Sequence, residues 1–309
     1  MVERYRHYQP NRQRQSINQG PPRKRRGRLI FLLLLIVTGL FIGYKQIYKP
    51  SRAPSQKKEN VVINKGPELK KVSQASWEQI QHVVDVDSDA NPDLDISLSL
   101  LDVRAGIAKN FGSQIDFAAA STTKVLTAVA YLHGVEAGDA TLDEEIGGLP
   151  ASRQLKQMIN QSNNESWAAL NEAIGRSEIE SYAKKIGMNS YINQGNTLKA
   201  SDMALLLSKL ADGKLINNKH QKLLYSFMQN TNNEDMIPGA IPQGATLYHK
   251  YGQLDDRLHD AAIVNYKQRP LVIVIYTKGT PATGKNYNIH TKIIQSIAEN
   301  SITIFYRDL

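Results

Sequence analysis

The chain contains no cysteine among its 309 residues. This absence excludes a disulfide framework, thiolate metal sites, iron–sulfur clusters and a cysteine nucleophile. Histidine is also scarce, with seven scattered residues and no His-x-x-x-His pair, so we expect no metal site. No glycine-rich phosphate loop follows a predicted strand. The sequence therefore predicts chemistry that needs neither a metal nor another cofactor.

Acidic residues are rare in the first part of the chain and common in the rest. The net charge of +9 divides into +8 for residues 1–28, +6 for residues 45–71 and −5 for residues 72–309. A basic chain first suggests a nucleic-acid partner. Because the largest segment is mildly acidic and shows no basic aromatic face, we expect no nucleic acid to bind it.

Residues 29–44 (LIFLLLLIVTGLFIGY) carry no charge at all. As a helix this run would span about 24 Å, and Arg28 and Lys45 could extend their charged ends to the lipid headgroups. The alternatives are a cleaved signal peptide and a buried core helix, but no small-x-small cleavage site follows. The run predicts a transmembrane signal anchor in the lipid bilayer. Because an arginine-rich stretch precedes it, we expect a cytoplasmic N-terminus and an extracytoplasmic remainder.

Composition divides the rest of the chain into three parts. Residues 1–28 lack apolar periodicity, which predicts a disordered basic cytoplasmic tail, and residues 45–71 predict a flexible basic tether for the same reason. From residue 72 to residue 309 no internal repeat and no Pro/Gly/Ser-rich linker divides the sequence. We therefore expect one extracytoplasmic domain over residues 72–309.

Within residues 72–309, strand patterns lie near both ends and helical patterns lie between them. Apolar spacing predicts helices over residues 72–84, 122–133, 155–174 (interrupted near 161–164), 178–186, 201–211, 219–228 and 289–306. Alternating or β-branched runs predict strands over residues 96–103, 107–112, 246–252, 259–265 and 271–277. Because short turns connect the strands, we expect an α/β domain with a mainly antiparallel five-stranded sheet.

Serine followed by lysine three residues later occurs at three places. On a helix, this spacing puts both side chains on one face, where a lysine with a lowered pKa can accept the serine proton. Ser55/Lys58 lies in the predicted tether, and Ser181/Lys184 lies in a polar helix. Ser121/Lys124 instead follows FAAA and opens an apolar helix. The free backbone N–H of Ser121 could there stabilise an oxyanion, so this pair is the candidate for acyl transfer.

Two further elements follow in chain order, Ser162-Asn163-Asn164 in a helical interruption and Lys250-Tyr251-Gly252 on a predicted strand. With Ser121/Lys124 they make the sequence resemble the class A β-lactamase-like family of penicillin-recognising serine hydrolases. Its three motifs are Ser-x-x-Lys, Ser-Asp-Asn and Lys-Thr-Gly. The resemblance implies a β-lactamase/transpeptidase-like fold, with helices flanking the five-stranded sheet and an added all-helical subdomain.

The resemblance also implies a role for each matching residue. Ser121 would be the acyl-accepting nucleophile, Lys124 its proton acceptor, and Ser162 a proton relay to the leaving nitrogen. The remaining candidates would contact the substrate: Lys250 as positive charge for its carboxylate and for Ser162, Asn164 as a hydrogen-bond partner of its amide, and Tyr251, Gly252 and Gln253 as further binding residues. The backbone N–H groups of Ser121 and Gln253 would form the oxyanion hole.

The sequence departs from the family pattern in two ways. Class A enzymes hydrolyse their acyl-enzyme with a loop glutamate, whereas the corresponding connection here, residues 188–196, contains no acid. Glu178 and Glu180 belong to the preceding predicted helix and are weak substitutes. Tyr251 replaces the small hydroxyl residue of the third motif. These departures favour acylation over efficient β-lactam turnover.

The sequence thus predicts a membrane-anchored extracytoplasmic serine hydrolase. Its substrates would be β-lactams or the D-alanyl peptide ends of peptidoglycan, processed through an acyl-Ser121 intermediate. Two alternatives stay open. One is a cell-wall D,D-peptidase or transpeptidase of the same superfamily, and the other is a non-hydrolytic penicillin-binding or sensing domain.

Overall fold

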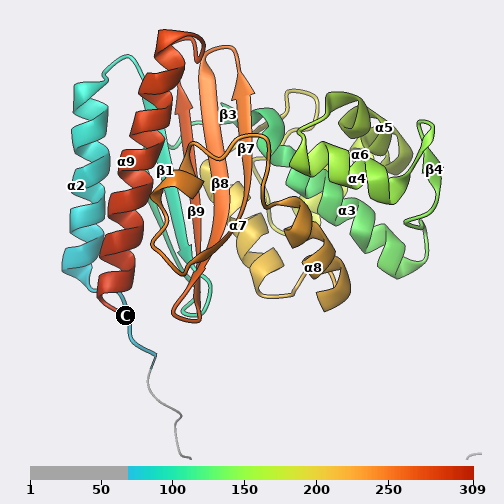
Figure 1. The fold of residues 1–309 in the computed structure, drawn as a ribbon, viewed down its shortest axis with the longest axis horizontal. Coiled ribbons are helices and arrows are strands. Elements are labelled where there is room, and N and C mark those ends of the chain that lie inside the picture. Colours follow the sequence, from blue (N-terminus) through green and yellow to red (C-terminus); the bar gives the residue numbers. More distant parts are fainter. Residues whose placement is uncertain (1–68) are drawn as a thin grey trace, which may run out of the picture. The chain divides into compact units, whose positions relative to one another are not determined.

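Five antiparallel strands form the central sheet of the protein (Figure 1). The computed structural model describes residues 69–309, and the structural statements below refer to these residues. The strand order is β2-β1-β9-β8-β7. The bounds are β1 (Asp95–Asp102), β2 (Ile107–Gly112), β7 (Thr246–Leu254), β8 (Arg257–Tyr266) and β9 (Arg269–Lys278). The predicted antiparallel sheet, built from strands near both ends of the domain, is confirmed.

Both faces of the sheet are buried along its central strands β1, β9 and β8, and successive side chains alternate between the two faces. On β9, one set packs into the core beneath the terminal helices: Leu271, Ile273 and Ile275. The other set packs into the core shared with the helical subdomain: Val272, Val274 and Tyr276. A strand covered on both sides loses its polar positions, and this explains the continuous apolar run in the sequence.

Two long helices, α2 (Gln74–Ala90) and α9 (Lys285–Arg307), lie side by side on one face of the sheet (Figure 1). The Ser73 hydroxyl caps α2 by accepting a hydrogen bond from the Ser76 N–H at 3.1 Å. The sequence predicted that α2 ends near residue 84, and this boundary is wrong. The helix continues because Asp85 and Asp89 are exposed to solvent and Asp87 is only half-buried, so these acidic residues do not interrupt it.

The opposite face is covered by α7 (Ala200–Ala211), which packs on β1 and β9. Beyond α7 lies the predicted all-helical subdomain. Its helices are α3 (Lys124–Ala137), α4 (Ala151–Asn160), α5 (Asn164–Ile174), α6 (Arg176–Lys185) and α8 (Asn218–Phe227). The interruption predicted near residues 161–164 is the connection between α4 and α5. It lies where the helical subdomain meets the sheet.

Several short elements were not predicted from the sequence, because runs of two to four residues show no periodicity. They are β3 (Phe117–Ala118) paired with β6 (Thr197–Leu198), β4 (Glu145–Ile146) paired with β5 (Leu149–Pro150), and the 3-10 helices η1 (Ala120–Thr123) and η2 (Ile237–Ala240). The β3–β6 pair has a functional consequence. It joins the segment just before Ser121 to the segment just before α7.

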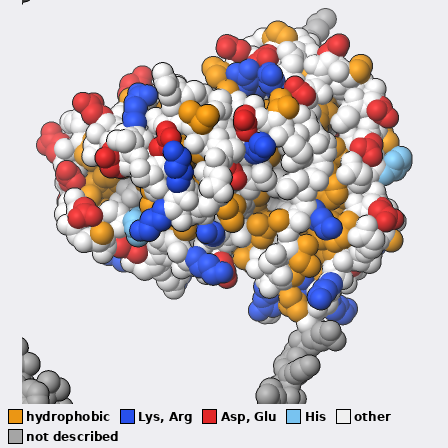
Figure 2. All heavy atoms as spheres, turned by 180° about the vertical axis from the view of Figure 1, so that it is seen from behind, with side chains coloured by type: hydrophobic (Ala, Val, Ile, Leu, Met, Phe, Trp, Pro, Cys, Tyr) orange, Lys and Arg blue, Asp and Glu red, His pale blue; other side chains and the backbone are white. Residues whose placement is uncertain are grey.

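Within residues 69–309, no helix has both the length and the apolar character to cross a lipid bilayer. The predicted tail (1–28), the predicted anchor (29–44) and all but the last residues of the predicted tether (45–71) lie outside the described residues. Figure 2 shows acidic and basic side chains interspersed on the face opposite to that of Figure 1.

Candidate active site

Ser121 lies in η1, one turn before α3 begins, rather than inside the α-helix. Ala120, just before it, has φ 50°, a left-handed conformation that costs energy for a residue with a Cβ. Buried Thr122 supports this turn: its hydroxyl donates to the Ala119 carbonyl at 2.8 Å and lies 2.7 Å from the Tyr276 hydroxyl. Ser121 thus projects from a tight turn that is anchored to the central sheet.

Lys124 is completely buried behind Ser121. Its ammonium donates to the Ser162 carbonyl at 2.7 Å and to Asn164 Oδ1 at 2.7 Å, and lies 3.4 Å from Ser162 Oγ. Burial lowers the pKa of Lys124 to about 8, although the charge of Glu165 opposes this shift. Within the described part of the chain, Ser121 Oγ makes no hydrogen bond. Lys124 therefore links the first motif to the second.

Ser162 occupies the connection between α4 and α5 with φ 56°, in the left-handed region. The next residue, Asn163, ends this connection by capping α5, and its side chain accepts a hydrogen bond from the Ser166 N–H at 2.6 Å. An N-cap residue begins a new helix in a new direction. The sequence Ser-Asn-Asn thus turns the chain so that Ser162 faces both Lys124 and Lys250.

Lys250 on β7 is completely buried as well. Its ammonium donates to Ser162 Oγ at 3.0 Å and to the Tyr251 carbonyl at 2.9 Å. It also lies 4.2 Å from the centroid of the Tyr251 ring. Burial and the nearby Lys124 charge lower the pKa of Lys250 to about 7, against the opposing charge of Asp260. Ser162 Oγ therefore lies between two lysines whose protons are easily lost.

Gly252 brings β7 against the nucleophile turn. A Cβ added there would lie 2.8 Å from the Ser121 nitrogen and 3.0 Å from the Ala119 oxygen, too close for any side chain. Gln253 follows on the same strand, and its side chain donates to the Ala282 carbonyl at 2.7 Å. The strand backbone thus runs beside the Ser121 N–H, where the sequence predicted the oxyanion hole.

Two histidines flank the third motif on neighbouring strands. His249 is buried, and although burial disfavours its charge, the adjacent Asp260 carboxylate at 3.0 Å raises the pKa of His249 to about 9. Burial instead lowers the pKa of His259 to about 4. The neutral His259 ring bonds the Ala118 carbonyl at 3.0 Å and accepts from the Thr277 N–H at 3.2 Å. His259 thus fixes the strand that leads to Ser121.

Asn196 is the residue near the site that sequence reasoning missed. Its side-chain amide donates to the Ala120 carbonyl at 2.8 Å, its Oδ1 accepts from the Thr123 hydroxyl at 2.7 Å, and its carbonyl accepts from the Ala119 N–H at 2.8 Å. Asn196 itself has φ 47°. It lies at the end of the acid-free connection 188–196. No local pattern in the sequence shows that its side chain contacts the residues on both sides of Ser121.

Comparison with known families supports the resemblance on which these assignments rest. A model of the "Beta-lactamase enzyme family" matches residues 75–305, about three quarters of the chain. The chain belongs to the β-lactamase enzyme family. No curated protein matches it. Serine hydrolase activity is typical of this family in general.

Solved structures share the fold of this β-lactamase family member at low sequence identity. A point mutant of PBP-A, solved as an acyl-enzyme complex with penicillin G, is 21% identical with a TM-score of 0.68, covering 75% of this chain and 97% of its own. A β-lactamase from Xanthomonas campestris is 18% identical with a TM-score of 0.67, covering 74% and 98%. An ancestral class A β-lactamase is 17% identical with a TM-score of 0.67, covering 73% and 100%.

Neither glutamate on α6 lies at the nucleophile. Glu180 pairs with Lys184 at 2.9 Å. Glu178 lines a cavity beside Ala130, which is about 9 Å further along α3 than Lys124 at the helical rise per residue. The acid whose charge Lys124 senses is Glu165, in the first turn of α5. The structure therefore gives this family member no acid from the connection before α7.

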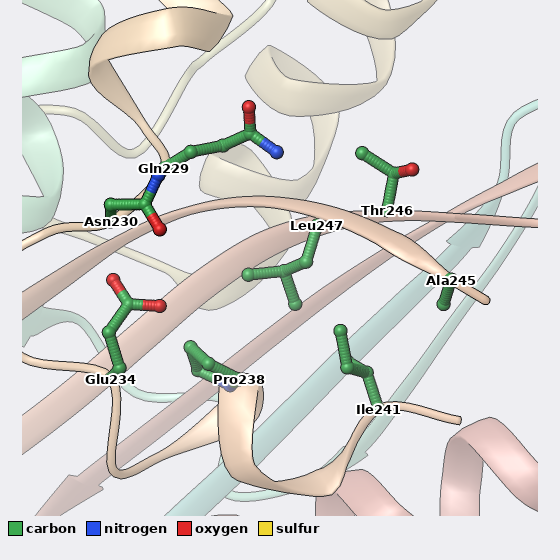
Figure 3. A pocket seen from close by; sticks show the side chains of 8 residues that line it. All are labelled: Gln229, Asn230, Glu234, Pro238, Ile241, Ala245, Thr246 and Leu247. Carbon is green, nitrogen blue, oxygen red and sulfur yellow. The ribbon is translucent and has the colours of Figure 1, made fainter. Parts of the chain in front are cut away.

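A separate pocket of about 330 Å³ opens at the start of β7, beside η2 (Figure 3). It contains one charged side chain, Glu234, and is otherwise lined by Gln229, Asn230, Pro238, Ile241, Ala245, Thr246 and Leu247. No residue of the three motifs lines it. Among residues 69–309, no group of three or more acidic or histidine side chains is arranged to hold a metal ion.

Proposed function

We propose that this protein is a membrane-anchored extracytoplasmic enzyme that forms an acyl intermediate on Ser121. The observation that carries the proposal is the convergence on Ser162 of two buried lysines, Lys124 and Lys250, directly beside the Ser121 turn. Buried lysines with a lowered pKa are uncommon in a purely structural role and suit proton transfer near neutral pH. Substrates would be β-lactams or related D-alanyl amides.

The reaction has a simple proton balance. Lys124 in its neutral form accepts the Ser121 proton as Oγ attacks the acyl carbon, and a bond forms between them. The bond between that carbon and the leaving nitrogen breaks, and the nitrogen takes the hydroxyl proton of Ser162. Ser162 in turn receives the proton that Lys124 accepted, because its Oγ lies 3.4 Å from the Lys124 ammonium, and Lys250 holds the same Oγ at 3.0 Å. The Ser121 N–H and the Gln253 N–H would hold the oxyanion. No metal or cofactor takes part.

The rate of deacylation distinguishes three versions of this proposal: a β-lactamase, a D,D-peptidase or transpeptidase, and a penicillin-binding sensor. The connection 188–196 offers no acid to activate water, and its last residue, Asn196, bonds the nucleophile turn instead. This arrangement favours a long-lived acyl-enzyme. A long lifetime fits a D,D-peptidase or transpeptidase that awaits an amine acceptor, or a penicillin-binding sensor, better than a fast β-lactamase.

A labelling experiment tests the proposal. The full-length protein is incubated with a fluorescent penicillin and, separately, with a fluorescent fluorophosphonate that carries no carboxylate. We expect covalent labelling that disappears in Ser121→Ala. The matched control is Ser181→Ala, because Ser181/Lys184 has the same spacing on the exposed side of α6 and should label normally. Absence of Ser121-dependent labelling by both probes would defeat the proposal, and the decay time of the label would distinguish hydrolase from trap.

A further inference from the structure

The aromatic ring of Tyr251 covers the buried ammonium of Lys250. Its ring centroid lies 4.2 Å from the Lys250 ammonium, within the range of a cation–π interaction. An ammonium has three N–H groups. Lys250 directs two of them to Ser162 Oγ and the Tyr251 carbonyl, and its remaining side faces the ring. In this arrangement Lys250 offers no N–H to an incoming anion.

The phenol is held in this position from the helical side of the site. The Tyr251 hydroxyl donates to Asn232 Oδ1 at 2.9 Å. The Asn232 side chain donates in turn to the Gln161 carbonyl at 3.1 Å, and Gln161 immediately precedes Ser162. Asn232 therefore connects β7 with the α4–α5 connection. The hydrogen bond fixes the phenol between the two parts of the structure that carry Lys250 and Ser162.

We propose that Tyr251 determines the charge preference of the site. Because the Tyr251 ring lies over Lys250, a carboxylate next to the scissile bond finds no cation to pair with. An uncharged ester or amide in the same position leaves no charge unpaired. A charge that loses water without gaining a partner is strongly disfavoured. The site therefore prefers acyl donors that are uncharged on the leaving side. This inference rests on the proposed acyl transfer to Ser121.

Two thioesters that differ only in charge test the preference. N-acetyl-D-alanyl thioglycolate carries a carboxylate on the leaving side, and its methyl ester does not; acylation of Ser121 releases the thiol from either. In full-length protein we measure the ratio of the two acylation rate constants. Tyr251→Thr uncovers Lys250 and should raise the carboxylate-to-ester ratio at least about tenfold, since a charge-assisted hydrogen bond accounts for a change of this size.

Two further variants locate the effect. Tyr251→Phe keeps the ring over Lys250 and should raise the ratio much less than Tyr251→Thr. Tyr266→Thr is the matched control, because Tyr266 also lies beneath a lysine, Lys267, but at the far end of β8. The carboxylate-to-ester ratio of Tyr266→Thr should equal that of the wild type. A ratio that stays the same or falls in Tyr251→Thr would overturn the inference, as would equal ratios in the Phe and Thr variants.

A binding measurement separates this inference from the proposed function. In Ser121→Ala, calorimetry compares N-acetyl-D-alanyl-glycine with its carboxamide, with and without Tyr251→Thr. We expect Tyr251→Thr, which removes the ring over Lys250, to strengthen binding of the carboxylate relative to the carboxamide at least about tenfold. If Ser121 is never acylated yet this selectivity changes, the proposed function fails and the charge preference holds. An unchanged selectivity rejects the charge preference even where Ser121 is acylated.

Discussion

The two buried lysines show how single residues acquire their chemical properties from their surroundings. Lys124 and Lys250 are removed from water, and each ammonium makes hydrogen bonds but, among residues 69–309, no salt bridge. Burial disfavours the charged form more than the charges of Glu165 and Asp260 favour it, so both pKa values fall. A lysine exposed to solvent would stay protonated at neutral pH and could not accept a proton from Ser121.

The pKa of Lys124 predicts the pH dependence of acylation. The proton acceptor must be neutral, and the neutral fraction rises with pH until the pKa of about 8 is passed. We expect the acylation rate to rise about tenfold per pH unit below that value and to level off above it. Stopped-flow measurement between pH 6 and pH 9 checks this. A flat profile would contradict a lysine base, and Lys124→Arg, which keeps its proton, should lose acylation at every pH.

Gly252→Ala should slow acylation of Ser121 about a hundredfold while the protein stays folded. The added Cβ would meet the Ser121 nitrogen at 2.8 Å, so the nucleophile turn must move. A displacement of about 1 Å at a reacting atom costs about a hundredfold in rate. Labelling of Ser121 measures the loss, and circular dichroism reports the fold. Gly134→Ala on α3 is a suitable control, because nothing lies within 4 Å of its added Cβ. Normal labelling of Gly252→Ala would refute this constraint.

At the scale of elements, the connection between α6 and α7 positions the nucleophile turn and supplies no catalytic acid. It ends in β6, which pairs with β3, so the segment before α7 lies beside the segment before Ser121. Asn196 adds side-chain bonds on both sides of the nucleophile, to Ala120 and Thr123. These bonds offset the cost of the left-handed Ala120. The connection thus holds the nucleophile turn but brings no carboxylate to it.

Asn196→Ala should slow acylation about tenfold or more, because the Ala120 carbonyl and the Thr123 hydroxyl both lose a partner. The loss should appear in the acylation rate constant rather than in the affinity for the acyl donor, since Asn196 acts through the turn. Asn193→Ala is the control, as its side chain bonds only the Tyr191 hydroxyl among the described residues. Equal effects of the two substitutions would assign Asn196 a purely structural role.

The sheet contains a buried ion pair that predicts a large effect on stability. Arg269 at the start of β9 bonds the Asp102 carboxylate at the end of β1, with side chains only 7% and 1% exposed. Asp102→Ala leaves the guanidinium buried without a partner, which costs about 3–5 kcal/mol in the free energy of unfolding. Urea denaturation measures the loss. Replacing both partners, by Leu and Met, should recover most of it, and a failure to recover would contradict this explanation.

At the scale of the whole molecule, the site depends on segments that are far apart in the sequence. Ser121, Ser162 and Lys250 come from a turn, an interhelical connection and a strand, and the sheet that supports them uses strands from both ends of the domain. Ser121 therefore lies at the boundary between the sheet and the helical subdomain, where it is partly exposed to solvent.

The proposed topology predicts a result in intact cells. If residues 29–44 anchor the chain with its N-terminus in the cytoplasm, protease added outside should cut within the basic segment 45–71 and release a fragment that still labels at Ser121. A cytoplasmic protein serves as the control for cell integrity. Complete protection of the full-length chain would contradict the topology.

The principal elements and the three motifs could be predicted because their signals are local. The β-branched run of β9, the apolar stripe of α9 and the serine–lysine spacing at Ser121 all lie within a few residues of sequence. The end of α2 was misplaced because exposed acidic residues are compatible with either helix or loop. Asn196 was missed because its partners, Ala119, Ala120 and Thr123, lie more than seventy residues away.

The sequence by itself determined the fold class, the order of the strands and helices, and the residues of the three motifs. Only the tertiary structure decided that both lysines lose access to water, that Asn196 holds the nucleophile turn and that Tyr251 lies over Lys250. The reason is physical: spacing along a chain sets which face of a helix or strand a residue occupies. Burial, hydrogen bonding and pKa depend on what other elements bring against that face.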